Sequence, residues 1–199
     1  MRHSISRFGI FAAIIGTWMG SASSESQAGL LPVNSTVAAD GSNFRYNYGV
    51  VLTSDSVLRT GDYFTVYDFA GIVPGTNTQP TGFTFSSANT GPTPPGTIPV
   101  DDPTIPNGTW TYTGQQTTVG QVGLGNFSLD STFGSVSNGF FTANTHRQVD
   151  GQTDSNITST TVPVPAAPGV PEPASLALAA IGLPLAGLFR YLRRQPKTV

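Results

Sequence analysis

The chain has 199 residues and no cysteine, and between its two end segments it carries three arginines against nine aspartates, a net charge of −6 over residues 29–169. The absence of cysteine excludes disulfides, thiolate metal sites and cysteine nucleophiles. An acidic body repels phosphate backbones, so nucleic acid is not an expected partner.

The first 28 residues predict a secretory signal peptide. Arg2 and Arg7 give a basic start, residues 8–20 form an apolar run of 13 residues, and small residues follow. A run of this length falls short of the roughly 20 residues that span a bilayer, which favours removal over an uncleaved anchor. Cleavage after Ala22 and cleavage after Ala28 are both compatible with the sequence.

Residues 29–162 predict an all-β ectodomain, because Thr, Ser, Gly, Asn and aromatic residues dominate and strong helix formers are scarce. The clearest strand is residues 44–52, where Tyr46, Tyr48, Val50 and Leu52 alternate with polar or small residues. Six further segments predict short strands: residues 63–69, 82–85, 109–113, 127–133, 139–143 and 156–162. Short strands separated by turn signals favour an antiparallel sandwich or a jelly roll.

Two proline-rich segments interrupt this pattern. Residues 89–108 hold six prolines and predict an extended surface loop, either an insertion or a functional element, because proline cannot donate to a sheet. Residues 163–169 predict a semi-rigid Pro/Ala linker.

The strand at residues 109–113 allows two interpretations. Alternation places Trp110 and Tyr112 toward the core and the three threonines Thr109, Thr111 and Thr113 on the opposite face. A threonine row of this kind also occurs on ice-binding surfaces. If Trp110 and Tyr112 instead faced solvent, their rings would form a candidate glycan-stacking platform.

Candidates for catalysis or metal binding are weak. His146 is the one histidine left after signal removal, so a metal site built from histidines is not expected, and a hydrolase would need His146 with a nearby aspartate. The aspartates raise the possibility of calcium: Asp101-Asp102 lie in the proline-rich loop, and residues 150–154 resemble a fragment of a calcium loop but lack the full ligand spacing. We therefore expect no enzyme activity, no metal and no cofactor.

Two further aspartates, Asp62 and Asp68, lie too far apart along one strand for paired acid–base work. The sequence places Asp62 in the turn after Gly61. It places Asp68 near a strand end, on the same side as Phe64 and Val66, where its carboxylate would either cap the strand or bond a neighbouring loop.

The C-terminal segment, residues 170–195, has three parts. The tripeptide Pro171-Glu172-Pro173 precedes a transmembrane helix predicted over residues 174–192, whose strictly apolar part has 16 residues and would measure about 24 Å as a helix. The predicted membrane-stop residues are Arg190, Arg193 and Arg194. Arginines at this end indicate a cytoplasmic C-terminus and an external body.

This arrangement resembles the PEP-CTERM sorting signal of Gram-negative bacteria, a tail that also carries an ice-binding-protein C-terminal label. The resemblance implies recognition of Pro171, Glu172 and Pro173 by an exosortase-type processing enzyme. It also implies a protein held in the inner membrane with its ectodomain in the periplasm, then passed to the outer surface or the medium. The expected function is a structural or adhesive envelope or matrix protein in an exopolysaccharide or biofilm context. The alternatives are a carbohydrate-binding module for matrix polysaccharide and, behind it, a hydrolase.

Overall fold

A computed structural model describes residues 29–117 and 121–166. Within these residues the fold is all-β, without a helix, and every paired strand is antiparallel to its neighbour. The strands are β1 (Leu30–Asp40), β2 (Asn43–Leu52), β3 (Ser56–Val57), β4 (Tyr63–Val66), β5 (Phe83–Ala88), β6 (Asn107–Tyr112), β7 (Val122–Ser131), β8 (Ser135–Arg147) and β9 (Thr153–Val164).

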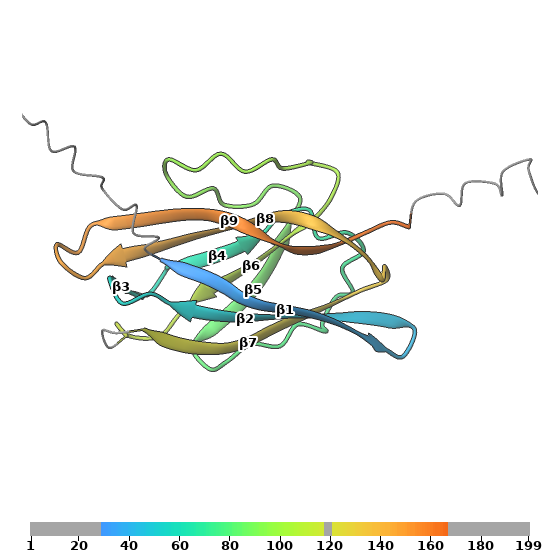
Figure 1. The fold of residues 1–199 in the computed structure, drawn as a ribbon, viewed down its shortest axis with the longest axis horizontal. Coiled ribbons are helices and arrows are strands. Elements are labelled where there is room, and N and C mark those ends of the chain that lie inside the picture. Colours follow the sequence, from blue (N-terminus) through green and yellow to red (C-terminus); the bar gives the residue numbers. More distant parts are fainter. Residues whose placement is uncertain (1–28, 118–120, 167–199) are drawn as a thin grey trace, which may run out of the picture.

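The strands form two sheets that face each other across one core (Figure 1). The first sheet has the order β1-β2-β7. In the second sheet β9 pairs along one edge of β8, while β3 and β4 follow one another along the other edge, and β6 and β5 continue outward from β4. This architecture agrees with the predicted antiparallel sandwich.

Aromatic side chains fill the space between the sheets. In β2 the alternation is as predicted, with Tyr46 and Tyr48 buried and their sequence neighbours partly exposed. The Phe64 ring stacks on the rings of Trp110 and Phe141, with centroids 5.1 Å away in both cases. The edge-to-face contact of Phe64 with Phe127, at 4.9 Å, joins the second sheet to the first. A cysteine-free domain thus obtains its stability from this apolar packing.

All seven predicted strands correspond to observed strands, but the sequence predicted neither β1 nor β3. β1 lacks a clean two-residue period and contains Pro32, both of which argue against a strand by pattern. It forms nonetheless because it is an edge strand that pairs with β2 alone, where a residue without an N–H group is tolerated.

The predicted strand at residues 63–69 is shorter than expected, since β4 ends at Val66. Asp68 has a φ of 53°, in the left-handed region, so the chain leaves the extended conformation there. The prediction that Asp68 shares a side with Phe64 and Val66 was therefore wrong. The predicted bond to a neighbouring loop is present, because Asp68 Oδ1 accepts from the N–H of Asp102 at 2.9 Å.

The proline-rich loop, predicted over residues 89–108, ends at Pro106, because Asn107 and Gly108 belong to β6. It covers the face of the second sheet that points away from the core (Figure 1). The hydroxyl of Tyr67 donates to the Pro92 carbonyl at 2.8 Å. A Cβ added at Gly91 would lie 3.0 Å from the Thr65 methyl group and 3.2 Å from the Tyr67 ring, so the loop backbone closely approaches the sheet. The second sheet is thus covered on both faces at this point.

At the other end of the chain, β9 extends through Pro163 to Val164, two residues into the predicted Pro/Ala linker. β9 is an edge strand, which again accommodates proline. Because β1 and β9 run side by side in the same direction, the described chain begins at one end of the sandwich and finishes at the other (Figure 1).

Candidate functional site

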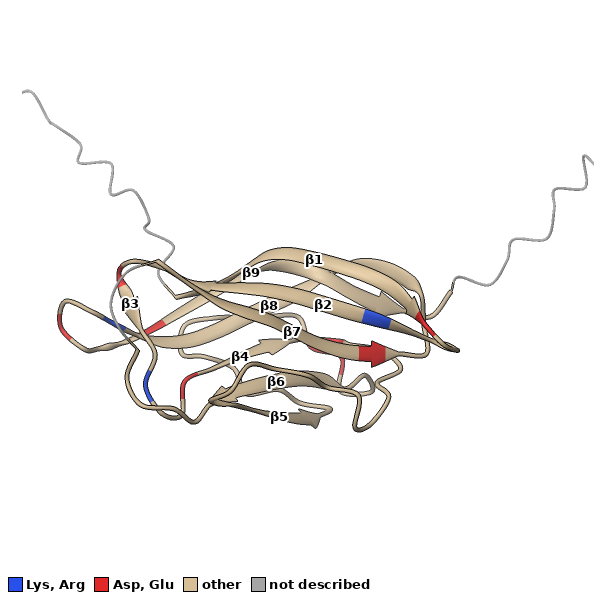
Figure 2. Cartoon of the chain, turned by 90° about the horizontal axis from the view of Figure 1, so that it is seen from below, with Lys and Arg blue, Asp and Glu red and all other residues tan. Residues whose placement is uncertain are grey.

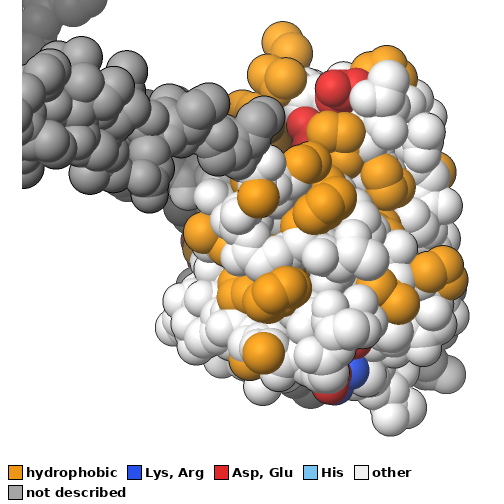
Figure 3. Space-filling view, turned by 90° about the vertical axis from the view of Figure 1, so that its right-hand side faces the viewer, with side chains coloured by type: hydrophobic (Ala, Val, Ile, Leu, Met, Phe, Trp, Pro, Cys, Tyr) orange, Lys and Arg blue, Asp and Glu red, His pale blue; other side chains and the backbone are white. Residues whose placement is uncertain are grey.

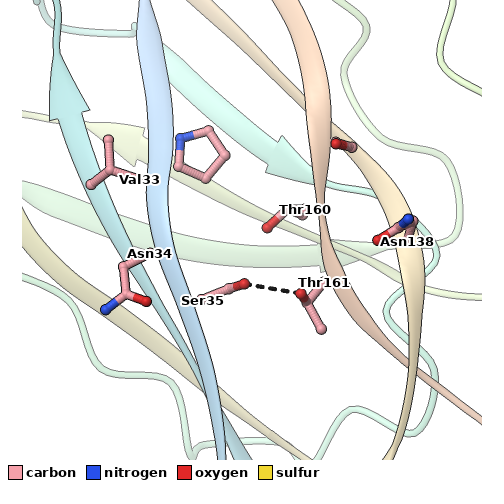
Figure 4. A pocket seen from close by; sticks show the side chains of 8 residues that line it. Val33, Asn34, Ser35, Asn138, Thr160 and Thr161 are labelled. Carbon is pink, nitrogen blue, oxygen red and sulfur yellow. Dashed lines mark hydrogen bonds between the residues drawn. The ribbon is translucent and has the colours of Figure 1, made fainter.

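A polar groove lies where the edges of the two sheets meet, between β1 and β9. It is open to solvent and has a volume of about 210 Å³. We call it the seam groove; its lining residues are Pro32, Val33, Asn34 and Ser35 of β1, Asn138 of β8, and Ser159, Thr160 and Thr161 of β9 (Figure 4).

Side chains, not backbone ladders, hold the two edges together. The Asn156 amide donates to the Leu30 carbonyl at 2.9 Å, and five residues further along each strand the hydroxyls of Ser35 and Thr161 lie 2.9 Å apart. The Tyr48 hydroxyl, reaching across from β2, donates to the Thr161 carbonyl at 2.8 Å. Burial raises the pKa of Tyr48 well above its ordinary value, so this hydroxyl stays a donor.

A bulge shapes the β1 side of the seam groove. The β1–β2 register shifts between Pro32 and Asn34, which leaves Val33 outside the ladder and 60% exposed. Bulges redirect side chains at sheet edges. The bulge therefore places an exposed apolar side chain beside the amide of Asn34 at the groove.

The lining is uncharged and rich in hydrogen-bonding groups. No Asp, Glu, Lys or Arg lines the seam groove, and Figure 2 shows β1 and β9 without charge along their middle portions. Thr160 is 7% exposed, and no group in the described residues bonds its Oγ1. Figure 4 shows this hydroxyl directed from β9 toward β1. Buried polar atoms usually have partners. Among the described residues, Thr160 Oγ1 shares this lack of a partner with Arg59 Nε, Trp110 Nε1 and Asn156 Oδ1.

A second feature is a carboxylate–histidine pair at the end of the sandwich where β2 finishes and β4 begins. His146 Nδ1 lies 3.0 Å from Asp62 Oδ1 and 3.1 Å from Oδ2, so the structure does bring the histidine to an aspartate. Asp62 is 1% exposed and also accepts from the Arg59 N–H at 2.8 Å and, more weakly, from the Asn144 amide at 3.4 Å.

These contacts identify Asp62 as the anchor of the Arg59–Asp62 turn, as the sequence predicted. Its N–H donates back to the Arg59 carbonyl at 2.9 Å, and its carbonyl accepts from the Tyr112 N–H at 2.7 Å. Among the described residues, the hydrogen-bond partner of the His146 ring is Asp62, and no serine or threonine hydroxyl is bonded to it.

The glycan platform expected at Trp110 and Tyr112 needs correction. Trp110 is 0% exposed and stacks within the core, so its ring offers no face to a sugar. Tyr112 is partly buried against Phe83 and donates its hydroxyl to the Gln115 carbonyl at 2.6 Å. Alternation along β6 carries Trp110 inward together with the stacked Phe64, which is the first of the two interpretations of this strand.

The threonine row on the same strand is also not free. Thr109 is 6% exposed and shares a 2.9 Å hydrogen bond with the buried Thr65 hydroxyl. Its burial under the proline-rich loop removes one member of the row that an ice-binding surface would need.

The aspartates considered for calcium binding instead hold their own turns. Asp101 accepts from the Asn107 amide at 2.9 Å, and Asp102 accepts from the N–H and hydroxyl of Thr104. Asp150 accepts from Arg147 and from the Gln152 N–H. Across residues 29–117 and 121–166 no group of three or more metal-binding side chains gathers.

Burial raises the pKa of Asp68, and repulsion from Asp101 and Asp102 adds to this effect, while the Asp102 N–H opposes it. The pKa of Asp102 is lowered by the two bonds from Thr104. The three carboxylates thus join the proline-rich loop to the end of β4, and their ordinary loop contacts account for them.

The residues expected to direct sorting lie outside the described part of the chain. They are Pro171, Glu172 and Pro173, together with Arg190, Arg193 and Arg194. The signal peptide and the predicted transmembrane helix also lie outside it. Within the described ranges, no helix of membrane-spanning length and apolarity occurs.

No protein-family model matches the chain, and neither does any curated protein.

Proposed function

We propose that this chain is an exported, non-enzymatic β-sandwich protein of the cell envelope or extracellular matrix, with a structural or adhesive role. The observation that carries the proposal is the order of segments: a signal-like start, a cysteine-free acidic body, Pro171-Glu172-Pro173, an apolar run and terminal arginines. The tail resembles a sorting signal that an exosortase-type enzyme processes.

The fold supports this proposal in a specific way. The described chain starts at one end of the sandwich and finishes at the other (Figure 1). An anchor C-terminal to β9 would hold the domain by one end and present the opposite end, with the Asp62–His146 pair, away from the membrane. The end of the sandwich at which β9 finishes shows apolar side chains among polar ones and few charges (Figure 3).

The test is the intact mass of the protein recovered from cells and from medium. A C-terminus near residues 171–174 supports processing, and a C-terminus at Val199 in the membrane fraction overturns the sorting proposal in favour of an ordinary anchor. A Glu172→Ala variant should retain the full C-terminus. The matched control Pro168→Ala changes a proline upstream of the motif and should be processed normally.

A second candidate, carbohydrate binding, is favoured by the uncharged polar seam groove. Sugars present dense hydroxyl groups, and a ligand site typically pairs apolar surface with a few placed polar groups. The hydrolase alternative has the Asp62–His146 pair as its structural support within the described residues.

A further inference from the structure

We infer that the seam groove binds one or two residues of a neutral polysaccharide. This inference rests on the carbohydrate-binding candidate above and assigns it a location and a ligand class. It is independent of whether the tail is processed.

The groove has a high capacity for hydrogen bonds. Its lining combines two amides, from Asn34 and Asn138, with hydroxyl groups from β1 and β9. Amides and hydroxyls both donate and accept, as sugar hydroxyls do, so they match a polyol without bringing a fixed charge into the site.

The buried hydroxyl of Thr160 also points to a polar ligand. Its Oγ1 is bonded by no described group although it lines the groove and is directed toward β1 (Figure 4). Leaving a buried hydroxyl without a partner destabilises a fold, and an isosteric valine would avoid that cost. A ligand hydroxyl in the groove would supply the partner.

The lining also includes aliphatic surface, from Pro32 and from the exposed, bulged Val33, which Figure 4 shows on the side of β1 that faces away from β9. A pyranose ring has apolar C–H faces as well as polar edges, so this neighbourhood suits it. The volume of about 210 Å³ is below the range of pockets for drug-sized ligands, which run from about 300 to 1,000 Å³, and so favours a short stretch of a sugar chain.

The groove is also preorganised. The bonds Asn156–Leu30 and Ser35–Thr161 fix the two strands on either side of the groove. A site held by its own scaffold loses less conformational entropy when ligand binds.

The charge of the domain selects the class of polysaccharide. Three arginines against nine aspartates give residues 29–169 a net charge of −6, and no cation lines the groove. Uronate-rich polysaccharides would be repelled, so a neutral chain is the ligand that the electrostatics favour.

The experiment is calorimetric titration of the full chain, purified from membranes in a detergent without a sugar headgroup. The probes are cellotetraose, maltotetraose and chitotetraose as neutral oligosaccharides, and tetragalacturonate as the anionic comparison. We expect at least one neutral probe to bind and tetragalacturonate to bind more weakly. A ligand concentration of about 10 mM is high enough to detect even millimolar dissociation constants. If no neutral probe binds up to that concentration, both this inference and the carbohydrate-binding candidate are overturned.

Three variants test the location. Thr160→Val preserves side-chain shape, and Asn138→Ala alters an exposed residue, so both should fold. We expect each to weaken binding of the neutral probe at least about fivefold, the effect of losing one hydrogen bond to ligand. Thr84→Val, on β5 at the far edge of the same sheet, should bind normally. Unchanged binding in both groove variants would overturn the seam groove as the site while leaving carbohydrate binding elsewhere in force.

Discussion

The hydroxyls of Ser35 and Thr161 lie 2.9 Å apart although 126 positions separate the two residues in the chain. They belong to β1 and β9, the edge strands of two different sheets. Their contact replaces the backbone ladder that would otherwise have to close the sandwich at this side. The seam groove lies beside this contact.

Thr160 and Thr109 form a matched pair for testing the buried hydroxyls. Both are nearly buried, but Thr109 Oγ1 has the Thr65 hydroxyl as partner and Thr160 Oγ1 has none among the described groups. We expect Thr160→Val to raise the free energy of unfolding by about 0.5–1 kcal/mol, and Thr109→Val to lower it by about 1–2 kcal/mol because Thr65 loses its partner. Urea denaturation measures both changes. If both variants changed the free energy of unfolding equally and in the same direction, the finding that Thr109 has a hydrogen-bond partner and Thr160 has none would be contradicted.

Asp62 should matter more for stability than its histidine partner. Asp62→Ala would leave three donors, from Arg59, Asn144 and His146, without their acceptor, and we expect it to cost about 2–4 kcal/mol. His146 is 22% exposed at its side chain, so water can replace part of its contacts and His146→Ala should cost about 1 kcal/mol.

Thermal and urea unfolding of the two variants give these values. A larger loss for His146→Ala than for Asp62→Ala would contradict the role of Asp62 as turn anchor. The same His146 variant serves the hydrolase alternative: any hydrolytic activity that the protein has and that survives His146→Ala excludes this histidine from catalysis.

Asp68 gives the structure a pH dependence with a definite sign. Because burial raises its pKa in the folded protein, the stability contributed by protonated Asp68 is present below the unfolded pKa and is lost as pH rises through the folded pKa. Asp68→Asn keeps the acceptor for the Asp102 N–H, remains neutral and suits the left-handed φ of 53°. We therefore expect Asp68→Asn to be more stable than the parent at pH 7, by less than about 1 kcal/mol after solvent screening, and the gain to shrink toward pH 3.

Asp102→Asn is the control for this effect and should behave in the opposite sense. The Thr104 bonds lower the pKa of Asp102, so the stability that its charged form contributes is present above the unfolded pKa and is lost as pH falls through the folded pKa. Stability curves of both variants between pH 3 and pH 7 test the pair. A gain for Asp68→Asn that grew toward pH 3 would contradict a raised pKa at this carboxyl.

The fluorescence of Trp110 should report on the hydrophobic core and should not respond to ligand binding. Its ring is fully buried between Phe64 and Phe85, so its fluorescence should be blue-shifted and poorly quenched by iodide. A neutral oligosaccharide that binds the seam groove should leave this emission unchanged. The measurement uses protein recovered after signal removal, because Trp18 lies in the predicted signal peptide. Strong iodide quenching would show an exposed Trp110 and revive the stacking platform.

Truncating this tryptophan is correspondingly uninformative about glycans. We expect Trp110→Ala to cost about 3–5 kcal/mol through the cavity that it leaves. Loss of glycan binding in that variant would then follow from unfolding, which is why the groove variants Thr160→Val and Asn138→Ala are the appropriate test.

The amino-acid sequence by itself determined those parts of the molecule whose signals are local. The period-two pattern around Tyr46 and Tyr48 specifies a strand with one buried face, since successive side chains of a strand point to opposite sides. Six prolines between residues 89 and 108 specify a loop, because proline lacks the donor that a ladder needs. The absence of cysteine fixed the means of stabilisation, and alternation already placed Trp110 inward as one of two interpretations.

The tertiary structure alone decided the relationships between distant polar residues. β1 has no clean two-residue period, and β9 is too rich in Ser, Thr and Asn to show which face is buried, so nothing in their pattern predicts that Ser35 meets Thr161. The Asp62–His146 pair, 84 positions apart, depends in the same way on how β8 pairs with β3 and β4. Hydrophobic periodicity encodes burial, whereas hydrogen bonds between polar side chains depend on which strands the whole fold brings together.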